Sequence, residues 1–233
     1  MHIGLIGGIG VAATVLYYQR LTAMADQRDM PLNLTIAHAD IQTLIRNARA
    51  DDRAAQADVF AEMSDQLKAG GASCVALTSL GAHFCAQEFA QRSALPVISG
   101  VAPLDDHFAQ QGFARVGLLG TPVVMRSHLY GQLHKTQAVT LEDEIETLGQ
   151  TYIDMAVAGR CDAQQRQQLL DAGARMVHEH DAQAIVLAGT DLNLAFDNQN
   201  TDYNVIDAVD VHVAQLAELA AGTCRLEDVA MER

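Results

Sequence analysis

Cys74-Val-Ala-Leu-Thr-Ser-Leu-Gly-Ala-His83 is the most informative segment of the sequence, because the second half of the chain repeats its pattern as Ala184-Ile-Val-Leu-Ala-Gly-Thr-Asp-Leu-Asn193. In both, a short apolar run suited to a buried parallel strand follows a helical segment and ends in small polar residues. Ligands bind at the carboxyl ends of strands in open α/β sheets. The repeat therefore predicts one site built between two related halves.

The composition is that of a soluble globular protein. Of the 233 residues, 49% are hydrophobic and 19% are charged, and no run of about 18 apolar residues predicts a membrane span. The formal charge of −14 argues against nucleic-acid binding, which needs a basic surface. The first residues lack the basic region of a secretory signal, so we expect a cytoplasmic protein with free thiols. The cysteines, which show no CxxC spacing, are Cys74, Cys85, Cys161 and Cys224.

Predicted strands and helices alternate along the chain, which indicates parallel sheets with helical crossovers. No linker rich in proline, serine or charge separates the halves. We therefore expect a chain that crosses between two α/β sub-domains more than once. The expected first sub-domain covers residues 1–97 plus 208–233, and the second covers residues 98–207.

Two helices are predicted from particular residues. Val59, Met63 and Leu67 recur at a spacing of four, which predicts an amphipathic helix. A second helix is expected to run through Met125 and Tyr130. The polar stretch before the first of these helices is interpreted as a solvated face.

The loop Gly8-Ile-Gly10-Val-Ala-Ala13 fits a relaxed dinucleotide-binding pattern, because it follows a predicted strand and precedes a predicted helix. Backbone N–H groups at a helix N-terminus favour any anion, so the loop suits a phosphate or a carboxylate. Asp40 is the acidic residue that would hold the ribose of a dinucleotide, although it lies farther along than the usual ~20 residues. A dinucleotide-dependent oxidoreductase is therefore one alternative function.

Motifs along the whole chain resemble the aspartate/glutamate racemase family of cofactor-independent amino-acid racemases. The matching segments are Gly4-Leu-Ile-Gly-Gly-Ile-Gly with Thr14 and Tyr17-Tyr18, His38-Ala-Asp40 with Arg49, Leu118-Leu-Gly-Thr121 with Met125 and Tyr130, and Val205-Ile-Asp207 with His212. The resemblance implies two Rossmann-like parallel-sheet sub-domains related by a pseudo-twofold, with an active-site cleft between them. It also implies a homodimer that needs no cofactor and takes a small carboxylate or amino acid.

The chemistry that the resemblance implies uses two cysteines, one removing the Cα proton and the other returning a proton to the opposite face. In this sequence Thr78 stands at the first cysteine position and Gly189 at the second. A hydroxyl is a far weaker acid than a thiol, and glycine has no side chain, so the ordinary two-thiol reaction is not expected. Asp191 is the best remaining acid–base candidate, with help from Thr78 and His83.

The other candidate residues are substrate-binding positions. They are Gly8, Thr14, Asp40, Arg49, Ser79, Thr121 and Thr190. Of these, Arg49 is the side chain best suited to bind a substrate carboxylate through two hydrogen bonds. No local cluster reaches three metal ligands, so no metal site is predicted. Two functions remain beside the oxidoreductase: a one-base isomerase or lyase, and a non-catalytic relative that binds an acidic amino acid or a dicarboxylate.

Overall fold

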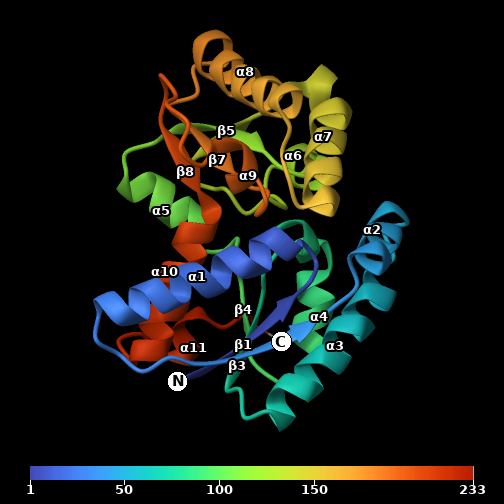
Figure 1. Cartoon of the computed structure of the whole chain (residues 1–233), viewed down its shortest axis with the longest axis vertical. Helices are drawn as coiled ribbons and strands as arrows, with labels where there is room; N and C mark the ends of the chain where they lie inside the picture. Colours follow the sequence, from blue (N-terminus) through green and yellow to red (C-terminus); the bar gives the residue numbers. More distant parts are fainter. Residues whose placement is uncertain (233) are drawn as a thin grey trace. The chain divides into compact units, whose positions relative to one another are not determined.

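The computed structural model describes residues 1–232, which form two α/β units. The first unit comprises Met1–Gly100 together with the segment from His212 onward, and the second comprises Val101–Val211. Each unit contains a four-stranded parallel sheet with helices packed against it (Figure 1). The α/β fold class with parallel sheets, predicted from the alternation of strands and helices, is therefore confirmed.

The first unit is built on a sheet whose central strands are buried. Its elements are β1 (His2–Gly7), α1 (Val11–Gln27), β2 (Asn33–His38), α2 (Ile41–Arg49), α3 (Arg53–Ala69), β3 (Cys74–Leu77), a short 3-10 helix (Gly81–Cys85), α4 (Ala86–Arg92), β4 (Val97–Ile98), most of α10 (Ala208–Ala221) and α11 (Leu226–Val229). The strand order is β2-β1-β3-β4, and all neighbouring strands are parallel. β3 is buried along its whole length, as its continuous apolar run predicts.

The second unit repeats this arrangement. Its elements are α5 (Leu104–Gln110), β5 (Arg115–Leu119), α6 (Pro122–Arg126), β6 (Gln137–Val139), a short 3-10 helix (Glu142–Glu144), α7 (Ile145–Ala158), α8 (Ala163–His180), β7 (Ala184–Leu187), α9 (Asn193–Phe196) and β8 (Val205–Asp207). The strand order is β6-β5-β7-β8, so β5, β6, β7 and β8 hold the positions that β1, β2, β3 and β4 hold in the first sheet. The two repeated stretches of sequence, β3 and β7, therefore hold equivalent places in the two sheets.

Helix α3 is amphipathic, as expected, and it packs along β1 and β2 and against α2 and α4 (Figure 1). Its buried face differs from the predicted one, because Val59 and Met63 are only half-buried. The side chains that face the core are those of Ala57, Phe60, Ser64 and Leu67. Phe60 is fully buried on this face, and its ring packs against Phe89 of α4. Gly70 ends the helix, as predicted.

The helix expected to run through Tyr130 stops at Arg126, so that prediction is wrong. The residues beyond it have left-handed backbone conformations, which cannot continue a right-handed helix. They are His128 (φ 48°), Leu129 (φ 57°), Tyr130 (φ 61°) and Gly131 (φ 68°). Only the last is a glycine, so the sequence carries little signal for this left-handed turn.

The segment after the left-handed turn is held by a single carboxylate. Asp105 of α5 accepts hydrogen bonds from the backbone N–H groups of His134, Lys135 and Thr136. Burial opposes the ionisation of Asp105, but these hydrogen bonds outweigh it and lower its pKa. The ionised form therefore stabilises the connection into β6.

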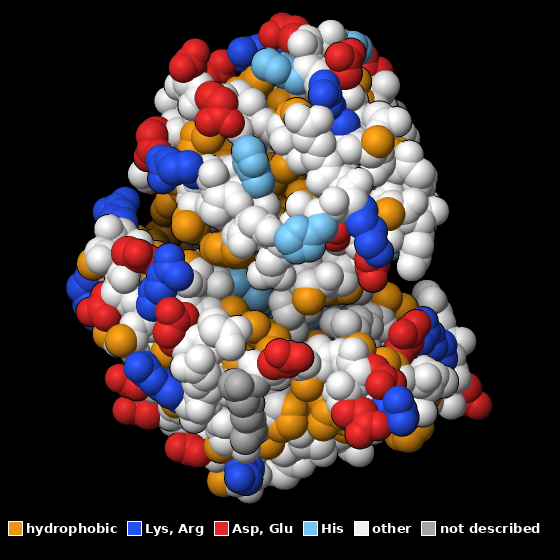
Figure 2. Space-filling model, turned by 180° about the vertical axis from the view of Figure 1, so that it is seen from behind, with side chains coloured by type: hydrophobic (Ala, Val, Ile, Leu, Met, Phe, Trp, Pro, Cys, Tyr) orange, Lys and Arg blue, Asp and Glu red, His pale blue; other side chains and the backbone are white. Residues whose placement is uncertain are grey.

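Acidic and basic side chains are interspersed on the face shown in Figure 2, and no continuous basic area appears there. Within residues 1–232, no helix combines the length and the apolar character needed to cross a membrane.

Candidate functional site

The carboxyl end of β3 places Thr78 in the interior of the first unit. Its side chain is fully buried, and its hydroxyl donates a hydrogen bond to the carbonyl oxygen of Ile6 over 3.2 Å. The same hydroxyl oxygen lies 3.1 Å from the hydroxyl oxygen of Thr14. Thr78 therefore contributes to the connection of β3, β1 and α1, and its single hydroxyl proton already has acceptors.

The glycine loop before α1 is closed by its own threonine. The backbone N–H of Gly8 donates to the hydroxyl of Thr14 over 2.9 Å, and that hydroxyl donates to the carbonyl oxygen of Gly10 over 2.9 Å. Gly8 has a left-handed φ of 82°, and a Cβ there would lie 2.4 Å from the carbonyl oxygen of Ala39. Local packing thus explains the glycine, and one N–H of the loop, that of Gly8, is already engaged. The geometry disfavours the dinucleotide alternative.

His83 is buried just beyond the strand end, and both of its ring nitrogens have partners. Nε2 accepts a hydrogen bond from the backbone N–H of Gly100 over 3.0 Å. Nδ1 lies 2.9 Å from the carbonyl oxygen of Ser79, so this hydrogen-bond pattern assigns the ring proton to Nδ1. Burial lowers the pKa of His83 to about 4, so the ring is neutral at pH 7. It connects the end of β3 to the segment that follows β4.

His212 of α10 lies next to this connection and is completely buried. Its Nδ1 lies 2.8 Å from the hydroxyl oxygen of Tyr17 in α1. A Cβ on Gly100 would lie 2.8 Å from the same nitrogen, so the backbone approaches the ring closely. Burial, and then the proximity of His83, lower the pKa of His212 to about 3. The two neutral histidines link α1, α10 and the ends of β3 and β4 within the first unit.

The carboxyl end of β7 carries the sequence-predicted residues Gly189, Thr190 and Asp191, all buried. Tyr152 of α7 packs against this end, where a Cβ on Gly189 would lie only 2.5 Å from its Cε2 atom. The Tyr152 hydroxyl donates to Oδ2 of Asp191 over 3.4 Å. Burial, and then the charge of Asp191, raise the pKa of Tyr152 well above its ordinary value, so the phenol stays protonated.

Two polar atoms at this strand end are buried without a hydrogen-bond partner among the described residues. They are the hydroxyl oxygen of Thr190 and the amide oxygen Oδ1 of Asn193. Such atoms are rare in folded proteins because each unpaired one is destabilising. Both atoms are acceptors, which an N–H or O–H donor would satisfy. Neither Tyr152 nor the role of Asn193 was predicted from the sequence.

The remaining candidate residues lie at the ends of helices. Asp40 caps α2, since its carboxylate accepts from the backbone N–H and the hydroxyl of Thr43, and these bonds lower its pKa. Thr121 caps α6 in the same way, accepting from the N–H of Val124 over 3.3 Å. Arg49 is exposed at the opposite end of α2 from Asp40. The structure thus gathers Gly8, Thr14, Thr78, Ser79 and His83 around the first strand end, and Gly189, Thr190 and Asp191 around the second.

The two core cysteines are poorly suited to acid–base chemistry. Burial raises the pKa of Cys74 to about 11. Burial, and then the neighbouring Glu88, raise the pKa of Cys85 to about 12. Both thiols therefore stay protonated at neutral pH. Over residues 1–232, no three His, Cys, Asp or Glu side chains are grouped so as to hold a metal ion.

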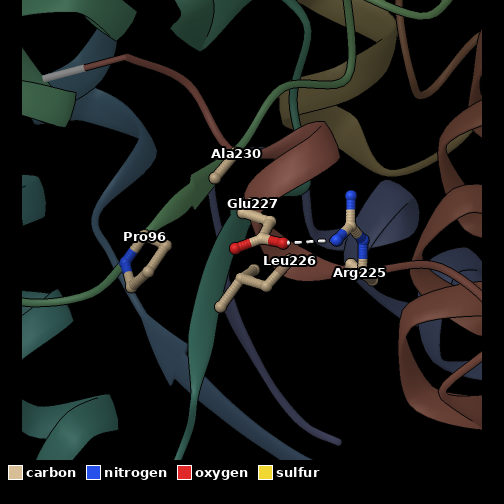
Figure 3. Close-up of a pocket in the computed structure, with 5 residues that line it drawn as sticks. All are labelled: Pro96, Arg225, Leu226, Glu227 and Ala230. Carbon is tan, nitrogen blue, oxygen red and sulfur yellow. Dashed lines mark ion pairs between the residues drawn. The ribbon is translucent and has the colours of Figure 1, made fainter.

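A shallow pocket lies away from both strand ends, next to α11 (Figure 3). It is lined by Pro96, Arg225, Leu226, Glu227 and Ala230. The guanidinium of Arg225 pairs with the carboxylate of Glu227 over 2.8 Å and also with Asp228. Because its one positive charge is already neutralised, this pocket is a poor site for a small acid.

The comparison with protein families gives one match, to the Asp/Glu/Hydantoin racemase family, over residues 6–216. No curated protein matches the chain in sequence.

Solved structures with the same fold come from several organisms. An aspartate racemase homologue from Pyrococcus horikoshii is 19% identical with a TM-score of 0.75, covering 94% of this chain and 99% of its own. The aspartate racemase of Picrophilus torridus is also 19% identical, with a TM-score of 0.73 and 95% of each chain covered. A maleate isomerase from Pseudomonas putida, solved with maleate, is 18% identical with a TM-score of 0.58, covering 100% of this chain and 99% of its own. At these identities the likeness shows the fold alone.

Proposed function

Because the chain belongs to the Asp/Glu/Hydantoin racemase family, we propose that it takes a small amino or carboxylic acid but does not racemise it with two thiols. The observation that carries this proposal is the chemistry of the two equivalent strand ends. β3 ends at Leu77 and is followed by Thr78, whose hydroxyl donates to the carbonyl oxygen of Ile6. β7 ends at Leu187, and two residues later comes Gly189, whose side-chain space is filled by Tyr152. Neither end offers a thiol.

Other side chains are poor replacements for the thiols. The two buried cysteines stay protonated at neutral pH, and the ring nitrogens of His83 are engaged in hydrogen bonds. At these two strand ends the buried carboxylate is that of Asp191, which is 1% exposed. A carboxylate in such a place is a suitable general base.

The proposed activity is one-base chemistry at the carbon next to a substrate carboxylate. The Asp191 carboxylate removes the Cα proton and becomes a carboxylic acid, while the electron pair stays on the substrate as a carbanion. The acid then returns its proton to the same face. This cycle exchanges the Cα hydrogen with solvent whenever the proton on Asp191 exchanges, and it leaves the configuration unchanged.

The substrate-binding residues are proposed from the resemblance and from the polar atoms at the strand ends. Asp191, Thr190 and Asn193 present acceptor oxygens, which favour an ammonium group and hence an amino acid. We retain Arg49 and Thr121 as proposed contacts of the substrate carboxylate, although each lies at the end of a helix. The resemblance also leads us to propose a cytoplasmic homodimer that uses no cofactor.

A non-catalytic relative that only binds the acid is the second candidate. It is favoured by the burial of Thr78 and Asp191, which are 0% and 1% exposed, because a reacting group must reach its substrate. The binding prediction is common to both candidates. They differ only in whether the Cα hydrogen exchanges.

The test is incubation in heavy water with the two enantiomers of aspartate and glutamate, and with malate and maleate. Calorimetry measures binding, and proton NMR measures loss of the Cα hydrogen. Exchange with retained configuration supports the one-base function, and it should disappear in Asp191→Asn. The matched control is Asp197→Asn, an exposed carboxylate a few residues along the chain. Binding without exchange supports the non-catalytic relative, and no binding of any of these acids contradicts the proposal.

A thermal-shift measurement with NAD and NADP separates the oxidoreductase alternative. We expect no rise in melting temperature, because the Gly8 N–H is already bound to Thr14. A rise that grows with dinucleotide concentration would favour that alternative.

A further inference from the structure

Gly189 is enclosed by a rigid ring rather than by a flexible side chain. A Cβ at this position would lie 2.5 Å from Cε2, 2.7 Å from Cζ and 3.0 Å from Cδ2 of Tyr152. A Cβ carbon essentially never lies within 3.0 Å of a non-bonded heavy atom, so any side chain at position 189 requires the ring to move. Tyr152 is 5% exposed, and its surroundings leave it little room.

The helix that carries Tyr152 cannot easily move back. One turn earlier in α7, a Cβ on Gly149 would lie 2.4 Å from Cγ of Pro122, the first residue of α6. Gly149 therefore lets α7 approach α6 closely, and this approach carries Tyr152 to the end of β7. The two glycines, Gly149 and Gly189, are both required by the position of a single helix.

The phenol of Tyr152 adds a polar contact to this packing. Its hydroxyl lies 3.4 Å from Oδ2 of Asp191, and its raised pKa keeps it a hydrogen-bond donor. The same strand end carries the buried, unpartnered hydroxyl of Thr190 and amide oxygen of Asn193. Tyr152 thus contacts both the backbone at Gly189 and the carboxylate of Asp191.

We propose that Tyr152 takes the place of a side chain at position 189 and is the positioning residue of Asp191. Its ring excludes a second acid–base side chain from this strand end, and its hydroxyl fixes the carboxylate of Asp191. This inference rests on the proposed one-base function for its catalytic consequence. Its structural part stands independently of any ligand.

The structural part is tested by thermal unfolding of the whole protein. Gly189→Ala should lower the melting temperature by about 5 °C or more, because its methyl group overlaps the ring. The matched control is Gly70→Ala, where φ is −77° and the nearest atom to the new methyl group lies 3.4 Å away. This control should unfold within about 2 °C of the wild type.

Two double-mutant cycles then locate the partner. The stability losses caused by Gly189→Ala and by Tyr152→Ala, added together, should clearly exceed the stability loss of the double variant, because the smaller side chain at position 152 removes the overlap. The losses in Tyr152→Phe and Asp191→Asn should likewise be non-additive, since both remove the same hydrogen bond. Additive losses in both cycles, or a Gly189→Ala variant as stable as the wild type, would overturn the proposal.

The functional part is tested by Cα exchange in heavy water. Tyr152→Phe keeps the ring. At a saturating concentration of the substrate acid, we expect the Cα exchange rate of this variant to fall at least about tenfold, while the substrate concentration that gives half the maximal rate changes less than about threefold. The control is Tyr203→Phe, which removes a phenol that donates to the carbonyl oxygen of Leu170 in the same unit. Unchanged exchange in Tyr152→Phe, or an equal loss in Tyr203→Phe, overturns the positioning role. If the wild type shows no Cα exchange, the one-base function and the positioning role of Tyr152 are both refuted. The double-mutant unfolding cycles then still decide whether Tyr152 fills the side-chain space at position 189.

Discussion

The buried histidine pair predicts that the first unit loses stability in acid before most carboxylates titrate. The pKa of His83 falls from 6.5 to about 4, and that of His212 from 6.5 to about 3, chiefly because of burial. The folded state therefore excludes protons that the unfolded state binds. A lowered histidine pKa stabilises the fold fully above pH 6.5, and this stabilisation is lost as the pH falls toward the folded-state pKa.

The magnitude follows from these pKa values. Between pH 7 and pH 4.5, each histidine should lower the free energy of unfolding by about 2.5 kcal/mol. Both together lower it by about 5 kcal/mol, a large share of the total stability of a typical domain. The slope in this range should approach about 2.7 kcal/mol per pH unit, in addition to any contribution from other groups.

The assay is urea unfolding followed by circular dichroism at pH 7.5, 6.5, 5.5 and 4.5. His83→Asn should lower the stability at pH 7.5 by about 2 kcal/mol, because the N–H of Gly100 loses its acceptor. It should also reduce the acid slope by about half. The control is His178→Asn on the exposed surface of α8, which should keep the wild-type slope. An unchanged slope in His83→Asn would show that the buried His83 ring does not cause the loss of stability in acid.

Three further predictions concern single groups. Thr14→Val should lower the free energy of unfolding by about 1–3 kcal/mol because the Gly8 N–H loses its acceptor; urea unfolding checks this against Thr22→Val, whose hydroxyl bonds only to its own helix. Asp105→Asn should lower stability by about 2 kcal/mol at pH 7 and speed amide exchange at residues 134–136. Since the pKa of Asp105 is lowered, this difference should shrink as the pH falls below 3.8, and a pH-independent difference would contradict its origin. In a thiol titration at pH 8, Cys161 and Cys224 should react in the native protein, whereas Cys74 and Cys85 should react only after unfolding; four reactive thiols in the native state would contradict their burial.

Most of the fold could be predicted because its signals are local. The central strands β3 and β7 are continuous apolar runs, and Gly70 marks the end of the helix before β3. The turn after α6 could not be predicted, because the left-handed residues His128–Tyr130 are not glycines. The buried face of α3 includes Phe60, whose ring packs against Phe89 of α4, a contact that periodicity alone does not reveal.

The candidate site was predictable only in part. The repeated stretches single out Thr78 and Gly189 as candidates, since each lies just beyond the carboxyl end of a strand in its own parallel sheet. Tyr152 could not be identified, because its approach depends on the close packing of Gly149 against Pro122. The partners of His83 were equally hidden, because a hydrogen bond to the backbone of Gly100 has no signature in the sequence.

The most direct test of the absence of two-thiol chemistry is a stereochemical one. Pure L-aspartate and pure L-glutamate are incubated separately with the protein, and the fraction of D-enantiomer is followed by chiral chromatography. Because neither Thr78 nor Gly189 supplies a thiol, we expect no D-enantiomer above the level of the protein-free control. Steady accumulation of the D-enantiomer toward an equal mixture, in proportion to protein concentration, would contradict it.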